Sequence, residues 1–94
     1  MEKERQKIEK TFTIKNRLGL HARAASKFVQ VANRFNSDIF VEKDGQEVNG
    51  KSIMGILILA AACGSEITIK AEGEDAEGAV KALGDLIDER FGEE

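Results

Sequence analysis

Hydrophobic and polar residues alternate along two short segments of the chain, which is the period of a strand with one buried face, and two further short segments flank a turn signal. Residues 8–15 alternate with one exception, and residues 66–72 alternate throughout. Residues 38–43 and 46–48 are separated by Asp44-Gly45, a dipeptide typical of hairpin turns. The pattern therefore predicts four strands, of which the second and third are antiparallel neighbours.

Two longer segments place apolar residues three and four positions apart, which is the period of a helix with one buried face. The first helix is predicted at 22–35 and the second at 76–91, with Arg90 in its last turn and Gly92 placed to end it. The apolar positions are Ala25, Phe28, Val29, Ala32 and Phe35 in the first helix, and Ala76, Ala79, Val80, Leu83, Ile87 and Phe91 in the second.

A third, short helix is predicted at 53–62, because Ser52 in front of it is a good N-cap. The segment is rich in β-branched residues and also fits a buried strand. With the helix chosen, the element order is β-α-β-β-α-β-α. Amphipathic helices combined with an antiparallel sheet predict an α+β fold, an open-faced sandwich in which helices cover one face of a four-stranded sheet.

Composition limits the chain to one domain, because 94 residues build a single hydrophobic core. We expect that domain to span 1–94, with 1–7 as a charged N-terminal extension. The longest apolar run, 53–63, is too short to span a bilayer, and the charged start lacks the apolar stretch of a signal peptide. We therefore expect a cytoplasmic protein without membrane insertion. One cysteine and one histidine predict neither an internal disulfide nor a metal site, and no cofactor is expected.

Charge is distributed unevenly in a way that bears on function. Residues 10–37 hold six basic residues and no acidic one, so this segment carries +6 and the remainder −9 of the net −3. The lone histidine, His21, lies inside the basic segment. Such a segment attracts anions, phosphate groups or an acidic partner surface, although it also fits charges that only keep the fold soluble. Nucleic acid is disfavoured, since the whole chain is acidic and lacks Trp, Tyr and a recognition motif.

His21 lies where the loop becomes the first helix, with Leu20 and Ala25 placed to fix the entry of the chain, so His21 is the predicted N-cap. The first backbone N–H groups of a helix have no intrahelical partner, and here they belong to Ala22, Arg23 and Ala24. A phosphoryl group on the imidazole would meet these groups and the Arg23 guanidinium. A lone histidine is more often an ordinary surface or packed side chain, and that interpretation stays open beside the chemical one.

No second acid, base or nucleophile accompanies His21 in the sequence, which favours a covalent carrier over a catalyst that completes a reaction alone. Two sequence motifs are informative when they are considered as a pair: Gly19-Leu20-His21-Ala22-Arg23-Ala24-Ala25 and Lys51-Ser52-Ile53-Met54-Gly55. At this separation the pair resembles the HPr phosphocarrier family of the bacterial phosphotransferase system. The resemblance covers about 8–91, and the predicted element order is also the order of that family's fold.

The resemblance implies specific partners and roles. His21 would accept phosphate on Nδ1 from the phosphoenolpyruvate-dependent enzyme I and pass it to enzyme IIA proteins, with Arg23 stabilising the phosphorylated ring. Ser52 matches a regulatory serine that a dedicated HPr kinase/phosphorylase modifies in many members, where phosphate adds about −1.5 to −2 charge. A plain N-cap remains the alternative role of Ser52. We expect a monomer.

The resemblance also implies a partner-docking surface near the histidine. Its expected residues are Leu20, Lys27, Ile53, Met54 and Leu57, for which core packing is the default alternative. One departure stands out, because Ala24 occupies a position where the family usually has proline. This puts the phosphotransfer rate in doubt but leaves the role intact.

Three rival functions remain open at this point. Residues 45–52 match the P-loop pattern from Gly45 to Ser52, but the strand and magnesium-binding aspartate that a P-loop NTPase needs are missing from the pattern. A regulatory module could act through phosphorylated Ser52 alone, which would leave His21 without a role. Cys63 could be a nucleophile, although a small buried thiol is the favoured interpretation.

Overall fold

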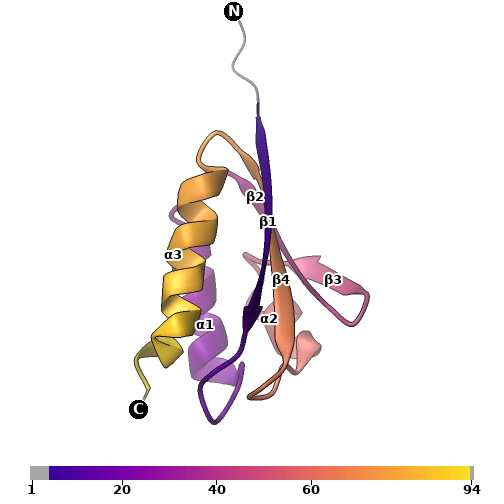
Figure 1. Cartoon of the computed structure of the whole chain (residues 1–94), viewed down its shortest axis with the longest axis vertical. Helices are drawn as coiled ribbons and strands as arrows, with labels where there is room; N and C mark the ends of the chain where they lie inside the picture. The colour runs from indigo at the N-terminus through magenta and orange to yellow at the C-terminus, as the bar shows by residue number, and fades with distance from the viewer. Residues whose placement is uncertain (1–4, 94) are drawn as a thin grey trace, which may run out of the picture.

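The computed structural model describes residues 5–93, and the fold has the predicted order β-α-β-β-α-β-α. Figure 1 shows α1 and α3 side by side on one face of the sheet, with α2 packed against α1. The elements are β1 (Gln6–Thr13), α1 (Ala22–Ala32), β2 (Asp38–Lys43), β3 (Gln46–Asn49), α2 (Ile53–Leu59), β4 (Glu66–Gly73), α3 (Ala76–Asp88) and a final 3₁₀ turn (Arg90–Gly92). The predicted α+β open-faced sandwich is confirmed.

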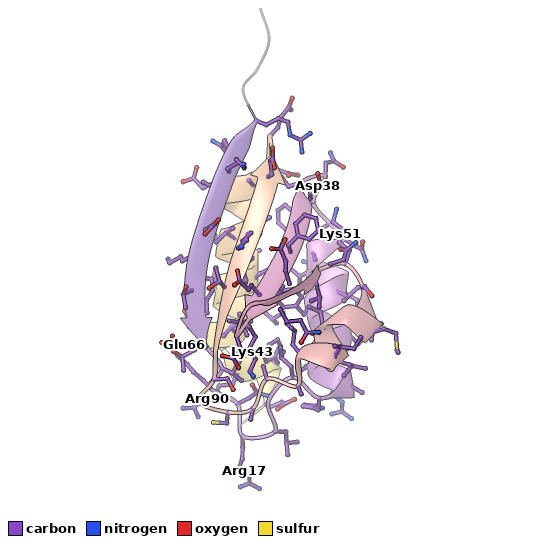
Figure 2. All side chains as sticks on the ribbon, turned by 90° about the vertical axis from the view of Figure 1, so that its right-hand side faces the viewer. Arg17, Asp38, Lys43, Lys51, Glu66 and Arg90 are labelled. Atoms are coloured by element: carbon purple, nitrogen blue, oxygen red, sulfur yellow. The ribbon has the colours of Figure 1, made fainter. Side chains whose placement is uncertain are left out.

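The sheet has four strands in the order β1-β4-β2-β3, and every neighbouring pair is antiparallel. Side chains alternate between its faces, so that Ile67, Ile69 and Ala71 of β4 are buried beneath the helices. The other face carries polar side chains, among them Lys70, which forms ion pairs with Glu42 and Glu47. Figure 2 looks onto this uncovered face.

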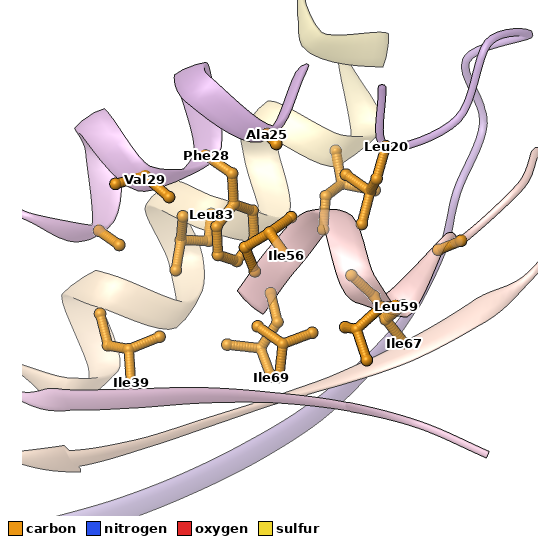
Figure 3. Close-up of a cluster of buried hydrophobic side chains, with 14 of the residues drawn as sticks. Leu20, Ala25, Phe28, Val29, Ile39, Ile56, Leu59, Ile67, Ile69 and Leu83 are labelled. Atoms are coloured by element: carbon orange, nitrogen blue, oxygen red, sulfur yellow. The ribbon is translucent and has the colours of Figure 1, made fainter. Parts of the chain in front are cut away.

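The core lies between the sheet and the three helices and joins residues from every part of the chain. Figure 3 shows Phe28 of α1, Ile56 of α2 and Leu83 of α3 meeting above Ile69 of β4. All four are fully buried, and each such side chain contributes about 1.5–3 kcal/mol through burial. The core thereby fixes how the starts of α1 and α2 sit relative to the sheet. No helix within residues 5–93 is long and apolar enough to cross a membrane.

Both predicted long helices extend too far at their C-terminal ends. The first ends at Ala32, not at residue 35, because Asn33 caps it and Phe35 continues in a tight turn, its N–H donating to the carbonyl of Ala32 at 3.2 Å. The last ends at Asp88, so Arg90 lies beyond α3 and not in its last turn. Helical periodicity persists past the residues that keep helical backbone angles, which explains both errors.

The remaining boundaries differ from the prediction by small amounts. The short segment after Ser52 is a helix as chosen, but it ends at Leu59, because Ala60 adopts left-handed backbone angles. β1 begins at Gln6 and ends at Thr13, so two residues of the predicted 1–7 extension belong to the strand. The first four residues of that extension lie outside the described residues.

Candidate functional site

The loop between β1 and α1 is shaped by one glycine that no other residue can replace without strain. Gly19 has φ +68°, and a Cβ built there would lie 2.4 Å from the carbonyl oxygen of Ala61. This close approach lets the N–H of Leu20 donate to the same oxygen at 2.9 Å. This hydrogen bond between Leu20 and the segment after α2 holds the next residue, His21, at the start of α1.

His21 is the N-cap of α1, as predicted, with extended backbone (φ −74°, ψ 179°). Its carbonyl accepts the first helical hydrogen bond, from the N–H of Ala25 at 2.8 Å. Its side chain makes no capping bond, and the first turn of α1 holds no acidic residue. The N–H groups of Ala22, Arg23 and Ala24 are therefore left for an anion beside the ring.

An open pocket of about 510 Å³ surrounds the imidazole. Arg17, Leu18, His21, Arg23 and Glu93 line it, which brings two guanidinium groups and one carboxylate to a single histidine. Both arginines are exposed, and neither forms an ion pair with another residue of the range 5–93. Figure 2 shows Arg17 projecting from its loop at one end of the molecule, the end where Arg90 also lies. The pocket can therefore receive a dianion such as a phosphoryl group.

The C-terminal segment reaches this pocket through an unusual turn. Arg90 and Phe91 have φ of 59° and 56°, a left-handed conformation that non-glycine residues rarely adopt, and Gly92 follows at 75°. The turn places Phe91 in the core, where it is fully buried, and its carbonyl accepts from Lys27 Nζ at 2.6 Å. Burial of this ring offsets the backbone strain and fixes the following residues beside His21.

Glu93 makes the direct contact with the histidine. Its Oε2 is hydrogen-bonded to His21 Nε2, and its Oε1 accepts from Asn16 Nδ2 at 3.0 Å. Asn16 is fully buried and also donates to the carbonyl of Gly19 at 2.7 Å. The hydrogen bond from Asn16, followed by that from His21, lowers the pKa of Glu93 below its ordinary value of 4.5. Glu93 is therefore a carboxylate at neutral pH.

Sequence reasoning found His21 and Arg23 but missed the other residues of the pocket. Arg17 was counted only among the basic residues of 10–37, and Asn16 and Leu18 were not singled out at all. Glu93 lies 72 residues from His21, and no local pattern marks such a contact. The one available signal was Phe91 as the last apolar position, which anchors the segment that carries Glu93.

Ser52 is the N-cap of α2, and this prediction is confirmed. Its backbone is extended (φ −114°, ψ 119°), and its Oγ accepts from the N–H of Gly55 at 3.0 Å. The side chain is partly exposed. Ser52 thus serves its own helix while its hydroxyl remains within reach of solvent.

The residues expected to dock a partner occupy different environments. Met54 is 68% exposed, Ile53 is exposed and Leu57 is half-buried. Leu20, in contrast, is 4% exposed and lies in the core, as Figure 3 shows, so its side chain offers little surface to a partner. Lys27 is half-buried, and its ammonium group donates to the Phe91 carbonyl.

Two further apolar side chains that were not predicted as docking residues are exposed. Leu18 in the loop before α1 is 67% exposed, and Ile58 of α2 is exposed as well. Leu18 also lines the histidine pocket. Apolar surface therefore lies at the edge of the charged pocket itself.

The structure argues against the P-loop interpretation and corrects the expected burial of Cys63. Residues 46–49, which lie within the segment that matches the P-loop pattern, form β3 and pair antiparallel with β2. The Lys51 ammonium group donates to the Phe35 carbonyl at 2.7 Å. A phosphate-cradling loop is thus not present at 45–52. Cys63 is exposed and not buried as expected, and its thiol lies 3.7 Å from the carbonyl oxygen of Lys15.

Comparison with known proteins identifies relatives over most of the chain. Residues 8–89 match the family model described as "PTS HPr component phosphorylation site". The phosphocarrier protein HPr of Neisseria meningitidis is 49% identical over 86 residues, 92% of this chain and 97% of that protein. The HPr-like protein Crh of Bacillus subtilis is 49% identical over 84 residues, 89% of this chain and 94% of that protein.

Solved structures agree with these sequence matches. The crystal structure of an HPr from Thermoanaerobacter tengcongensis has a TM-score of 0.90 and 55% identity, covering 93% of this chain and 98% of that one. A dimer of HPr from the same organism also matches, with a TM-score of 0.75 and 55% identity, covering 87% of this chain and 94% of that one.

Proposed function

This chain belongs to the HPr family of the phosphotransferase system, and on that premise we propose that it takes a phosphoryl group onto His21 and passes it to a partner protein. The family resemblance seen in the two sequence motifs is thereby confirmed. The donor is the phosphoenolpyruvate-dependent enzyme I, and the acceptors are enzyme IIA proteins. The chain acts as a covalent carrier within the relay and not as a catalyst on its own.

The observation that carries this proposal is the arrangement at the start of α1. His21 is an N-cap whose side chain does not cap, so the first N–H groups of α1 are left open next to an imidazole that lines the pocket. Arg23 and Arg17 add two cationic groups there. Each charge-assisted hydrogen bond to phosphate is worth about 1.5–3 kcal/mol, which suits a phosphoryl group that is held and then released.

Docking relies on exposed apolar side chains, of which Leu18 borders the pocket. Leu18, Ile53, Met54 and Ile58 are exposed in the free chain, and their burial against enzyme I or an enzyme IIA protein would bring the donor or acceptor atom to His21. Ala24, in place of the usual proline, occupies the first turn of α1 with a fully buried side chain. The turn therefore keeps its shape by packing, and phosphotransfer should proceed.

Ser52 supplies the proposed regulation. A phosphate on its Oγ, added by an HPr kinase/phosphorylase, would lie at the start of α2 next to Ile53 and Met54. There its charge would oppose an acidic partner and would interrupt the apolar surface. The relation to Crh also supports a second candidate, in which the chain acts as a regulatory module through phosphorylated Ser52 alone.

We place the protein in the cytoplasm, where its donors and acceptors act, and propose that it carries phosphate as a monomer. The dimer solved for HPr of T. tengcongensis makes the oligomeric state worth measuring. Sedimentation equilibrium of the free and the phosphorylated protein tests this directly, and a dimer in the phosphorylated sample would contradict it.

Phosphorylation of the purified chain tests the main proposal. The protein is mixed with phosphoenolpyruvate, magnesium and enzyme I, and its intact mass and the acid lability of the phosphate are followed. One acid-labile phosphate is expected on the wild type and on Ser52→Ala, and none on His21→Ala.

The same assay separates the two candidates. If a folded wild type stays unmodified beside an active control carrier, the phosphocarrier proposal fails. An acid-stable phosphate that an HPr kinase adds to the wild type but not to Ser52→Ala would then support the regulatory module.

A further inference from the structure

The contact between His21 and Glu93 has no part in the carrier function as stated so far. We propose that Glu93 is a positioning residue, which holds the His21 ring in the tautomer with the proton on Nε2 and the free lone pair on Nδ1. The inference rests on the proposed function, because the tautomer determines which ring nitrogen accepts the phosphoryl group. Its geometric basis is independent of that function.

The assignment of the proton follows from the chemistry of the two partners. An ionised carboxylate has only acceptor sites, so the ring nitrogen facing it must be the donor. Glu93 Oε2 faces Nε2, which therefore carries the hydrogen. A neutral imidazole has one N–H and one lone pair, so Nδ1 is left as the nucleophile.

The carboxylate is held firmly enough to impose this choice. Its second oxygen accepts from Asn16 Nδ2 at 3.0 Å, and the same amide group donates to the carbonyl of Gly19. One buried side chain thus links the carboxylate to the loop that carries the histidine. The Glu93 side chain is 18% exposed and that of His21 is 29% exposed, so both sit partly out of water.

Anchors on the backbone support the same placement. Phe91, two residues before Glu93, is fully buried, and its carbonyl accepts from Lys27 Nζ. The left-handed angles at Arg90 and Phe91 are the kind of strain that a fold retains where a segment is held in a defined position. The whole segment from the end of α3 therefore positions one carboxylate.

The group-transfer step is consistent with this arrangement. The Nδ1 lone pair forms a bond to phosphorus while the bond between phosphorus and the donor atom breaks, and the donor atom keeps that electron pair. Nε2 retains its proton throughout, so the ring becomes positively charged as the phosphoryl group arrives. Glu93 lies on the opposite side of the ring from Nδ1 and stabilises that charge, the part a carboxylate plays behind other catalytic histidines.

Nitrogen-15 NMR of the imidazole tests the tautomer directly, because His21 is the one histidine of the chain. At neutral to mildly alkaline pH we expect the wild type to show a single tautomer, with Nε2 protonated and Nδ1 bare. Glu93→Gln keeps the shape of the side chain but can donate as well as accept, so a mixture of tautomers is expected. Glu89→Gln, an exposed charge near the same end, is the matched control and should match the wild type.

The rate of phosphorylation by enzyme I gives the second readout. Glu93→Gln should lower the initial rate on the order of tenfold at an unchanged fold, and Glu89→Gln should leave it alone. A protonated Nδ1 in the wild type, or the same single tautomer in Glu93→Gln, would overturn the proposal. The spectra need no phosphoryl donor, so the tautomer is tested independently of the carrier function. If the wild type and Glu93→Gln are phosphorylated at equal rates, Glu93 has no positioning role, and the carrier function still stands because both proteins accept phosphate.

Discussion

The starts of α1 and α2 share a position but differ in what their N-cap side chains do. His21 and Ser52 both have extended backbone and both accept the first hydrogen bond of their helix through the carbonyl. The Ser52 hydroxyl then turns back and accepts from Gly55 three residues on. The His21 imidazole turns away and contacts Glu93, 72 residues on.

This difference separates a structural cap from a chemical one. Ser52 satisfies its own helix, so α2 begins stably without help from elsewhere. His21 leaves the N–H groups of its helix open, and the rest of the chain supplies its partner instead. A side chain that serves its own helix cannot also present that helix terminus to a phosphoryl group, whereas the imidazole of His21 can.

The largest expected effect comes from truncating Phe91, which anchors the segment that carries Glu93, the partner of His21. Phe91→Ala empties a fully buried site and should cost about 3–5 kcal/mol of unfolding free energy, measured by urea denaturation. It should also release Glu93, so the nitrogen-15 signals of His21 change while the amide signal of Gly55, bonded to Ser52, stays where it is. A shift of both signals would mean that the two caps are not independent.

Phe40→Ala is the control for this change. Phe40 lies on the uncovered face of the sheet and is partly exposed. Its truncation should cost far less and should leave the signals of His21 unchanged.

The second effect tests the charges around the two caps. Two residues after His21 stands Arg23, whereas two residues after Ser52 stands Met54. Arg23→Gln should slow phosphorylation of His21 by enzyme I about tenfold to a hundredfold, the equivalent of one charge-assisted hydrogen bond. Arg34→Gln, an exposed charge beyond the other end of α1, should not slow it. Equal rates for both variants would mean that Arg23 does not contribute, and would leave the anion site to Arg17 and the helix terminus.

The same contrast explains how far the sequence could predict the molecule. Strand alternation, helical faces and the caps at His21 and Ser52 depend on residues a few positions apart, and these predictions are confirmed. Phe35 and Arg90 were wrongly assigned to helices, because whether a helix continues depends on packing as well as on period. Glu93 was missed for a related reason, since only the folded core brings residue 93 to residue 21.

The third effect concerns the local cap alone. Ser52→Ala leaves the Gly55 N–H without its acceptor and should cost about 1 kcal/mol, read from urea unfolding followed by circular dichroism. Phosphorylation of His21 should be unaffected. Ser26→Ala, inside α1, is the matched control and should change stability by less than about 0.5 kcal/mol. A loss as large in Ser26→Ala would show that the cap has no special weight.

The smallest expected effect is a difference in pH dependence at the third helix start. Asp75, the N-cap of α3, resembles His21 in that its carboxylate bonds elsewhere, accepting from Ser37 Oγ and from the N–H groups of Asn36 and Ser37. These hydrogen bonds, that from the Ser37 hydroxyl first, lower the pKa of Asp75 below its ordinary value of 3.8. Because the folded pKa is the lower one, the carboxylate stabilises the fold above pH 3.8, and this stability is lost as the pH falls through the folded value.

Asp75→Asn keeps the shape and one acceptor oxygen, so it should be modestly less stable than the wild type at neutral pH, with the two unfolding free energies converging in acid. Asp44→Asn, at an exposed turn, should show no such convergence, and a constant gap between wild type and Asp75→Asn at every pH would mean that shape, not charge, holds this helix start.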